Sequence, residues 1–134
     1  MANSLTLMGL GMSPILANVI GENAVNIVPT AGTIATATQI PGSGFLIVAT
    51  TCTSGGGILL PNLGGGNGTD LGDVFIVTNV GANTLTVFAS NLLNAQTFTG
   101  TGASTAGTTG VSVSANYSRI FWQATTTTWA SMYA

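Results

Sequence analysis

Few residues in this chain could carry out chemistry. The charged side chains are Glu22, Asp70, Asp73 and Arg119, and the sequence contains neither histidine nor lysine. Acid–base catalysis at neutral pH needs a group that titrates near the working pH, and histidine most often supplies it. Without histidine, neither Cys52 nor any serine can be activated by the base of a usual catalytic triad. We interpret Cys52 as a small buried residue of a strand, and we expect no catalytic residues and no enzymatic activity.

The carboxylates of Asp70 and Asp73 are the closest pair of acids in the sequence. A carboxylate pair can hydrolyse a glycosidic bond, but no aromatic residue near them in the sequence would hold a sugar. Together with Asn67, the two aspartates could also offer oxygen ligands to calcium from a glycine-rich loop. Their spacing matches neither the EF-hand nor the nonapeptide β-helix pattern, so we interpret the segment as a solvated turn before a strand at Val74. We expect neither a metal nor a cofactor, while the calcium alternative stays open.

The near absence of charge is the main feature of the composition. Charged residues make up 3% of the 134 residues, against about 25% in a typical soluble domain. Binding to nucleic acid through its phosphates needs lysine and arginine, so nucleic acid is excluded as a partner. The net charge of −2 and the mean hydropathy of +0.56 also exclude intrinsic disorder. A folded monomer with so little charge is poorly protected against association, which favours permanent assembly with other subunits.

The N-terminal residues are apolar enough to raise the question of a signal peptide or a membrane span. They contain no lysine or arginine, and Gly9, Gly11 and Pro14 interrupt the apolar run. No uninterrupted apolar stretch reaches the roughly 18 to 20 residues that cross a bilayer as a helix. We therefore expect neither a signal peptide nor a membrane as a partner.

Residues 1–21 are expected to form an apolar arm that ends in a short helix. Ser13 followed by Pro14 is typical of a helix start, and Gly21 of a helix end. The arm has apolar side chains with nothing of its own to pack on, so it either tucks under the domain or docks on a partner. The predicted interface residues of the arm are Leu5, Leu7, Met8, Leu10, Met12, Ile15 and Leu16.

Residues 22–134 show an apolar pattern with a period of two and many β-branched side chains. Turn signals rich in glycine, proline and asparagine separate the segments. The pattern predicts a single compact all-β domain: a β-sandwich, a jelly-roll-like fold or a small barrel. The expected strands are Ala24–Val28, Thr33–Ile40, Gly44–Thr51, Ile58–Leu60, Val74–Asn79, Thr84–Ser90, Gly110–Ser114, Arg119–Ala124 and Thr128–Tyr133.

Two hairpins and one long loop are predicted within this domain. Phe75–Asn79 and Thr84–Phe88 flank a Gly-Ala-Asn turn, while Arg119–Gln123 and Trp129–Tyr133 flank a threonine-rich turn. Ala95–Thr109, rich in glycine and threonine, is expected to be a long loop. The threonines keep no fixed period, so the sequence does not predict a solenoid.

Arg119 and the aromatic residues after it are candidates for an interface. We expect the Arg119 side chain to be buried against one of the three carboxylates or to contact a neighbouring subunit. Alternation along a strand places Phe121 and Trp122 on opposite faces. One ring then points to the core, and the other points outward or into an interface. Arg119 and Trp122 complete the predicted interface residues.

Short segments spread over most of the chain share a recognisable pattern: Leu10–Ala17, Ile58–Pro61, Asp73–Asn79, Gly81–Val87, Gly110–Val113, Arg119–Trp122 and Thr128–Met132. Together they resemble the β-domains of small virion proteins of tailed bacteriophages, and the first of them looks like a segment that often begins such proteins. The resemblance implies a capsid decoration, or cement, protein. Such a protein is typically a homotrimer that sits where major capsid protein subunits meet.

The leading hypothesis is therefore a structural virion protein, made in the host cytoplasm, that binds the major capsid protein and stabilises the phage head. A charge-poor surface favours this role because few ions must be desolvated at the contact. Two alternatives stay open. One is a head-fibre or tail domain that binds a receptor, and the other is a self-assembling extracellular filament subunit.

Overall fold

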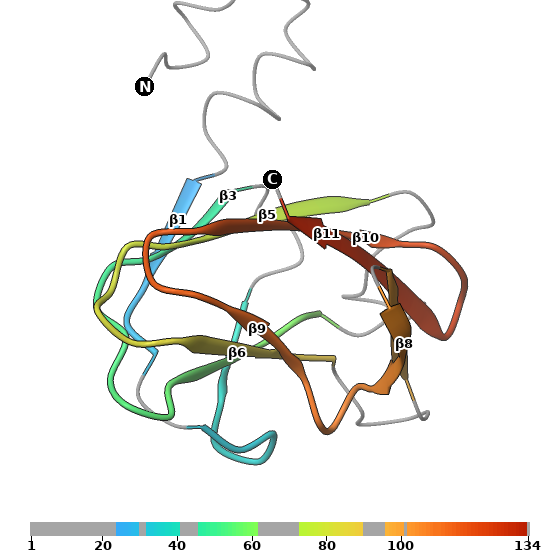
Figure 1. Ribbon diagram of the computed structural model, residues 1–134, viewed down its shortest axis with the longest axis horizontal. Coiled ribbons are helices and arrows are strands. Elements are labelled where there is room, and N and C mark those ends of the chain that lie inside the picture. Colours follow the sequence, from blue (N-terminus) through green and yellow to red (C-terminus); the bar gives the residue numbers. More distant parts are fainter. Residues whose placement is uncertain are drawn as a thin grey trace, which may run out of the picture.

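The computed structural model describes residues 24–29, 32–40, 46–61, 73–89, 96–100 and 102–133. These residues form two β-sheets, which Figure 1 shows one above the other, and the expected all-β class is confirmed. The larger sheet has seven strands in the order β1-β3-β5-β10-β11-β7-β8, and the smaller sheet has four in the order β2-β4-β6-β9. The strands are β1 (Ala24–Ile27), β2 (Thr38–Gln39), β3 (Leu46–Ala49), β4 (Gly57–Leu59), β5 (Val74–Asn79), β6 (Leu85–Phe88), β7 (Thr97–Gly100), β8 (Gly102–Ala106), β9 (Val111–Val113), β10 (Ser118–Gln123) and β11 (Thr128–Tyr133).

The first six strands build three parallel coils. The chain alternates between the sheets, so that β1, β3 and β5 belong to the larger sheet and β2, β4 and β6 to the smaller one. Neighbouring strands of this set pair in parallel within each sheet. In the larger sheet, for example, Val25, Ile47 and Val77 lie in one row across the three coils. This is the arrangement of a short parallel β-helix, a kind of solenoid.

The expectation that the chain is not a solenoid is therefore wrong. Paired residues of successive coils are 22 positions apart from Ala24 to Leu46, but 30 positions apart from Leu46 to Ile76. Coils of unequal length leave no fixed period in the sequence, which is the signal that a repeat search uses. The parallel pairing also differs from the antiparallel Greek-key pairing of a jelly roll. Over the described residues, both sheets are mixed and open.

One of the two predicted hairpins is wrong, and the other is confirmed. β5 pairs with β3 and β10, whereas β6 pairs with β4 and β9, so β5 and β6 lie in different sheets. The segment Val80–Thr84 between them is an arch that carries the chain from one sheet to the other. β10 and β11 do form an antiparallel hairpin, in which Arg119 lies opposite Tyr133.

The C-terminal strands complete both sheets. β10 pairs antiparallel with β5, and β9 pairs antiparallel with β6, so both sheets continue beyond the last parallel coil. β7 and β8 extend the larger sheet beyond β11 and occupy the segment predicted as a loop over Ala95–Thr109. The expected strand Thr33–Ile40 is mostly a turn, because the N–H groups of Thr36 and Ala37 both donate to the carbonyl oxygen of Thr33.

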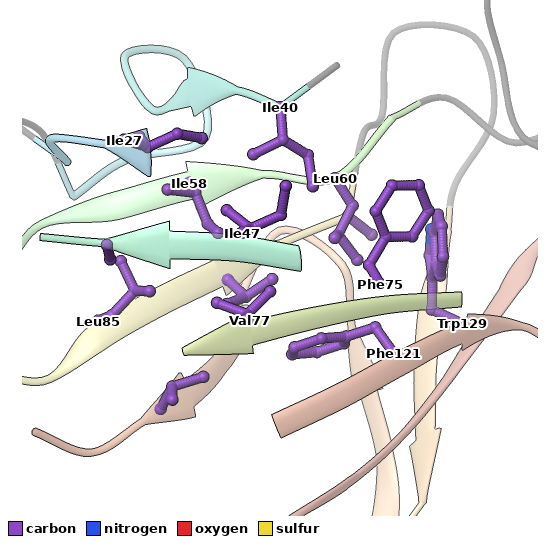
Figure 2. Packing of buried hydrophobic residues seen from close by; sticks show 14 of the residues in the cluster. Ile27, Ile40, Ile47, Ile58, Leu60, Phe75, Val77, Leu85, Phe121 and Trp129 are labelled. Carbon is purple, nitrogen blue, oxygen red and sulfur yellow. The ribbon is translucent and has the colours of Figure 1, made fainter. Parts of the chain in front are cut away.

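The core lies between the two sheets, as Figure 2 shows. The side chains of Ile47, Ile58 and Leu85 are fully buried there. Two aromatic pairs with edge-on geometry also belong to the core: Phe75 with Trp129 at 5.7 Å between ring centroids, and Phe98 with Phe121 at 5.9 Å. The predicted arm and helix over residues 1–21 lie outside the described residues, as do Glu22, Asn67 and Asp70.

Candidate interaction surface

The larger sheet has an inner face toward the core and an outer face on the opposite side. Alternate residues of β5 and β10 are buried, among them Phe75 and Phe121. The residues between them therefore point outward. Seven partly or well exposed apolar side chains occupy outward positions of four neighbouring strands, and we call them the apolar face: Leu46, Val48, Val74, Ile76, Ile120, Trp122 and Met132.

The pairing register makes the apolar face continuous. Ile76 on β5 is paired with Leu46 on β3 on one side and with Ile120 on β10 on the other. Ile120 is also paired with Met132 on β11, and Met132 is 46% exposed. Side chains of paired residues are close enough to touch. The outer face of a sheet that meets only water is usually polar, so this row is suited to a protein contact.

Hydroxyl groups border the apolar face on two sides. Thr78 on β5 and Ser118 on β10 share a hydrogen bond of 2.8 Å between their side-chain oxygens. On the other side, Thr97 on β7 and Thr128 on β11 lie 3.4 Å apart between hydroxyl oxygens. The outward positions in the described strands carry no charged residue. The outer face is therefore wettable but neutral.

A second neutral surface lies where β1, β3 and β5 end. The exposed fractions of Val28, Val80 and Tyr117 are 53%, 50% and 59%. Exposed apolar groups that gather at one end of a domain, among loops held by a rigid scaffold, are typical of an interaction site. We call this region the strand-end surface, and it consists of Val28, Thr50, Val80 and Tyr117.

Backbone hydrogen bonds hold the strand-end surface in place. The N–H of Thr50 donates to the carbonyl oxygen of Ile27, and the N–H of Val80 donates to that of Ala49, both at 3.0 Å. The parallel ladder therefore continues one residue beyond the ends of the strands. Tyr117 joins the same end of the sheet because its carbonyl oxygen accepts the N–H of Asn79 at 2.9 Å.

Arg119 lies inside the domain, with 9% of its surface exposed. Its Nη2 donates to Oγ of Ser131 at 3.0 Å, and its Nη1 donates to the carbonyl oxygen of Ser112 at 3.3 Å. The guanidinium carbon lies 4.6 Å from the centroid of the Tyr133 ring. Asp73 lies toward the opposite end of β5, about 13 Å along the strand from the residue paired with Arg119. Arg119 is thus buried against a hydroxyl, a carbonyl and a ring. The predicted contact with a carboxylate or a neighbouring subunit stays a prediction, since Glu22 and Asp70 lie outside the described residues.

Phe121 and Trp122 lie on opposite faces of β10, as predicted. Phe121 is fully buried in the core, and Trp122 is half-buried on the apolar face. Arg119 points to the inner side like Phe121, so Arg119 and Trp122 do not belong to one surface. The other predicted interface residues, Leu5, Leu7, Met8, Leu10, Met12, Ile15 and Leu16, lie outside the described residues.

Apart from Trp122, no residue of the apolar face or of the strand-end surface was predicted from the sequence as an interface residue. The sequence does contain a signal for the apolar face: the runs Leu46–Ala49 and Val74–Val77 are apolar at every position. A strand with consecutive apolar residues has two apolar faces, and only one of them can face this core. No comparable signal marks the strand-end surface, because it forms from residues of three coils together with Tyr117 from the connection between β9 and β10.

Cys52 is buried as expected, but it lies in the connection between β3 and β4 instead of a strand. Its Sγ lies 3.5 Å from the carbonyl oxygen of Thr53 and 3.6 Å from that of Thr84. Burial raises the pKa of the thiol, and a hydrogen bond with the backbone of Gly56 opposes this effect more weakly. The thiol therefore stays protonated at neutral pH, when it is a poor nucleophile.

The described residues contain no group of three or more histidine, cysteine, aspartate or glutamate side chains that could hold a metal ion. In the same part of the chain, no helix has the length and apolar character needed to cross a bilayer.

Comparisons with protein-family models, with curated proteins and with solved structures found no match. The two neutral surfaces and the resemblance given above are therefore the basis for a function.

Proposed function

We propose that the protein is a structural virion component: a homotrimeric decoration or cement protein that binds between major capsid protein subunits and stabilises a phage head. The observation that carries this proposal is the strand-end surface. There, Val28, Val80 and Tyr117 are each at least half exposed on one end of a rigid sheet. The resemblance to small virion proteins supplies the class of partner.

The chemistry of the strand-end surface fits a permanent protein contact. Tyrosine is enriched at interfaces because its ring buries a large apolar area while its hydroxyl keeps a hydrogen bond. Tyr117 can act in this way, and Val28 and Val80 add smaller apolar contacts beside it. Burying these neutral groups desolvates no ion, so the contact is insensitive to salt.

The scaffold adds pre-organisation. The strand-end residues follow directly from β1, β3 and β5, whose backbone ladder extends as far as Thr50 and Val80. Residues that are already ordered lose little conformational entropy on binding. A cement protein gains from this because its task is to hold neighbouring subunits in fixed positions.

The test is binding of the purified protein to capsid shells of the phage that encodes it, prepared without this protein. Val80→Asp places a charge in the contact, and Tyr117→Ala removes the largest ring. We expect each change to weaken binding by at least about tenfold, while raising the salt concentration to 1 M changes wild-type binding by less than about twofold. Thr126→Asp is the matched control, because it adds the same charge to an exposed turn at the opposite end of the larger sheet.

Native mass measurement gives the second part of the test, with a trimer expected. Failure of the wild-type protein to bind the shells would reject the cement role. Binding to host cells or glycans instead would favour the receptor-binding alternative, and fibres in negative-stain images would favour the filament alternative.

A further inference from the structure

The apolar face remains without an assigned partner after the strand-end surface has been given one. Its members come from β3, β5, β10 and β11, which are the central strands of the larger sheet. Val74 and Met132 are 38% and 46% exposed, and the other five side chains are half-buried. Contiguous apolar side chains on the outside of a sheet mark a place where another chain segment packs.

We propose that residues 1–23 of the same chain pack on the apolar face and cover Ile76, Ile120 and Met132. The proposal goes beyond the proposed function and does not rest on it. On β5 and β10, Thr78 and Ser118 lie between the apolar face and the strand-end surface, and Val48 occupies the same row on β3. A partner on the strand-end surface and the arm on the apolar face can therefore be present together.

The point where the described chain begins supports this occupant. Residue 23 precedes Ala24, the first residue of β1, and Ala24 is paired with Leu46 on β3. From Leu46 the same row continues through Ile76 and Ile120 to Met132. The arm therefore enters the sheet at one end of the row that it has to cover.

The length of the arm matches the distance to be covered. Four strand spacings separate β1 from β11, which is about 19 Å. A segment of 23 residues is about 35 Å long even when it is wholly helical. The arm can therefore reach Met132 from Ala24 without leaving the surface of the sheet.

The composition of the arm is complementary to the apolar face. Glu22 is its one charged residue, and it lies next to the point of attachment. In the short helix that the sequence predicts after Pro14, four apolar residues would share one stripe, which suits the flat outside of a sheet. These residues are Ile15, Leu16, Val19 and Ile20.

The covalent connection favours the arm of the same chain over a second copy or a capsid subunit. A segment tethered next to its site has an effective concentration in the millimolar range. A second copy would have to reach that concentration in solution to compete. Exchange of arms between copies and pairing of two apolar faces are the alternative occupants, and the experiment distinguishes them.

The experiment uses the full-length protein with p-benzoylphenylalanine in place of Met132, which is exposed enough to accept it. Equal amounts of isotopically light and heavy protein are mixed, irradiated and analysed by mass spectrometry. We expect cross-links to residues 1–23 within one chain, with a yield that does not change on dilution. The control places the same photoreactive residue at Thr126, where no cross-link to the arm is expected.

Cross-links between light and heavy arms would overturn the proposal in favour of arm exchange. Cross-links from one apolar face to another, or none to residues 1–23, would overturn it as well. These outcomes leave capsid binding through the strand-end surface unaffected, so failure of one proposal is distinguishable from failure of the other.

A second measurement does not depend on the photoreactive residue. Trp122 lies on the apolar face, whereas Trp129 is fully buried, so acrylamide quenching of fluorescence reports mainly on Trp122. We expect Leu16→Asp to raise the quenching constant at least about twofold. Ser4→Asp adds the same charge to a polar position of the arm and should leave the quenching constant unchanged. Equal quenching in the two variants would contradict the proposal.

Discussion

The side-chain amide of Asn79 links the two sheets, because its Nδ2 donates to the carbonyl oxygen of Val113 on β9 at 3.0 Å. The same nitrogen donates to the carbonyl oxygen of Asn83 at 2.8 Å, and Oδ1 accepts the N–H of Gly81 at 3.0 Å. In the two preceding coils the paired positions hold Ile27 and Ala49, which are buried and apolar. The third coil thus has a polar anchor where the chain turns from β5 into the arch.

Replacing Asn79 by leucine, which has a similar shape, should destabilise the fold strongly. The change removes two buried hydrogen bonds, to the carbonyl oxygen of Val113 and from the N–H of Gly81, and one part-buried bond to Asn83. Each unpaired buried group costs about 1 to 3 kcal/mol. We expect the free energy of unfolding, measured with urea, to fall by about 3 to 5 kcal/mol. Asn26→Ala is the control, since Asn26 is exposed on β1 and its loss should cost less than about 0.5 kcal/mol. Similar losses in both variants would show that Asn79 has no special role.

The arch also depends on a close approach between Gly81 and Cys52. A β-carbon at Gly81 would lie 2.4 Å from the backbone nitrogen of Cys52 and 2.8 Å from its β-carbon. Backbone atoms cannot move aside as a flexible side chain can, so Gly81→Ala should force the arch away from the loop after β3. We expect a loss of about 2 to 4 kcal/mol, read from the thermal midpoint and from urea unfolding. Ala82→Ser, at the exposed next position, should be neutral, and a neutral Gly81→Ala would show that the arch is not held tightly.

The same arch shows where prediction from the sequence succeeds and where it stops. The β-branched residues of Val74–Asn79 and the alternation over Thr84–Phe88 predict both strands correctly, because residue type and side-chain period are local properties. They predict the pairing of the strands wrongly, since a glycine-containing turn is compatible with either a hairpin or an arch. The choice is made by the Asn79 amide and by the contact of Gly81 with Cys52, and both involve residues distant in the sequence.

Prediction from local sequence also fails for β7 and for the two surfaces, because they depend on contacts between distant residues. The sequence Thr97–Gly100 has weak local signals, and it becomes a strand through parallel pairing with β11. The strand-end surface is likewise assembled from distant parts of the chain: three coils whose lengths differ, and Tyr117 before β10. By contrast, the all-β class and the β10–β11 hairpin depend on nearby residues, and they are predicted correctly.

Cys52 should make stability depend on pH in the alkaline range. Because burial raises the pKa of its thiol, the folded state keeps the proton at a pH where the unfolded chain has released it. This contribution is fully present below the pKa of the unfolded thiol and is lost as the pH rises through the folded value. Urea unfolding between pH 7 and pH 9.5 should therefore show stability falling, with a slope of at most about 1.4 kcal/mol per pH unit. Cys52→Ala should have a flatter profile, and an unchanged profile would mean that another group titrates.

Arg119 allows a test of whether its charge or its shape is needed in the core. The guanidinium contacts a hydroxyl, a carbonyl and the Tyr133 ring at once, and this requires a planar group with several donors. Arg119→Lys keeps the charge but cannot make these contacts together, so we expect the free energy of unfolding to fall by about 2 kcal/mol. Arg119→Met removes the cost of a buried ion while filling a similar volume, and its stability should stay within about 1 kcal/mol of the wild type.

Tyr133→Phe serves as the reference for the ring, because it keeps the aromatic face and removes only the hydroxyl, which lies 3.4 Å from the carbonyl oxygen of Ser112. Its stability should match that of the wild type within about 0.5 kcal/mol. If Arg119→Met is less stable than Arg119→Lys, then the positive charge itself stabilises the domain and its shape does not. That result would show that the Tyr133 ring and the neutral acceptors around the guanidinium favour a cation at this position.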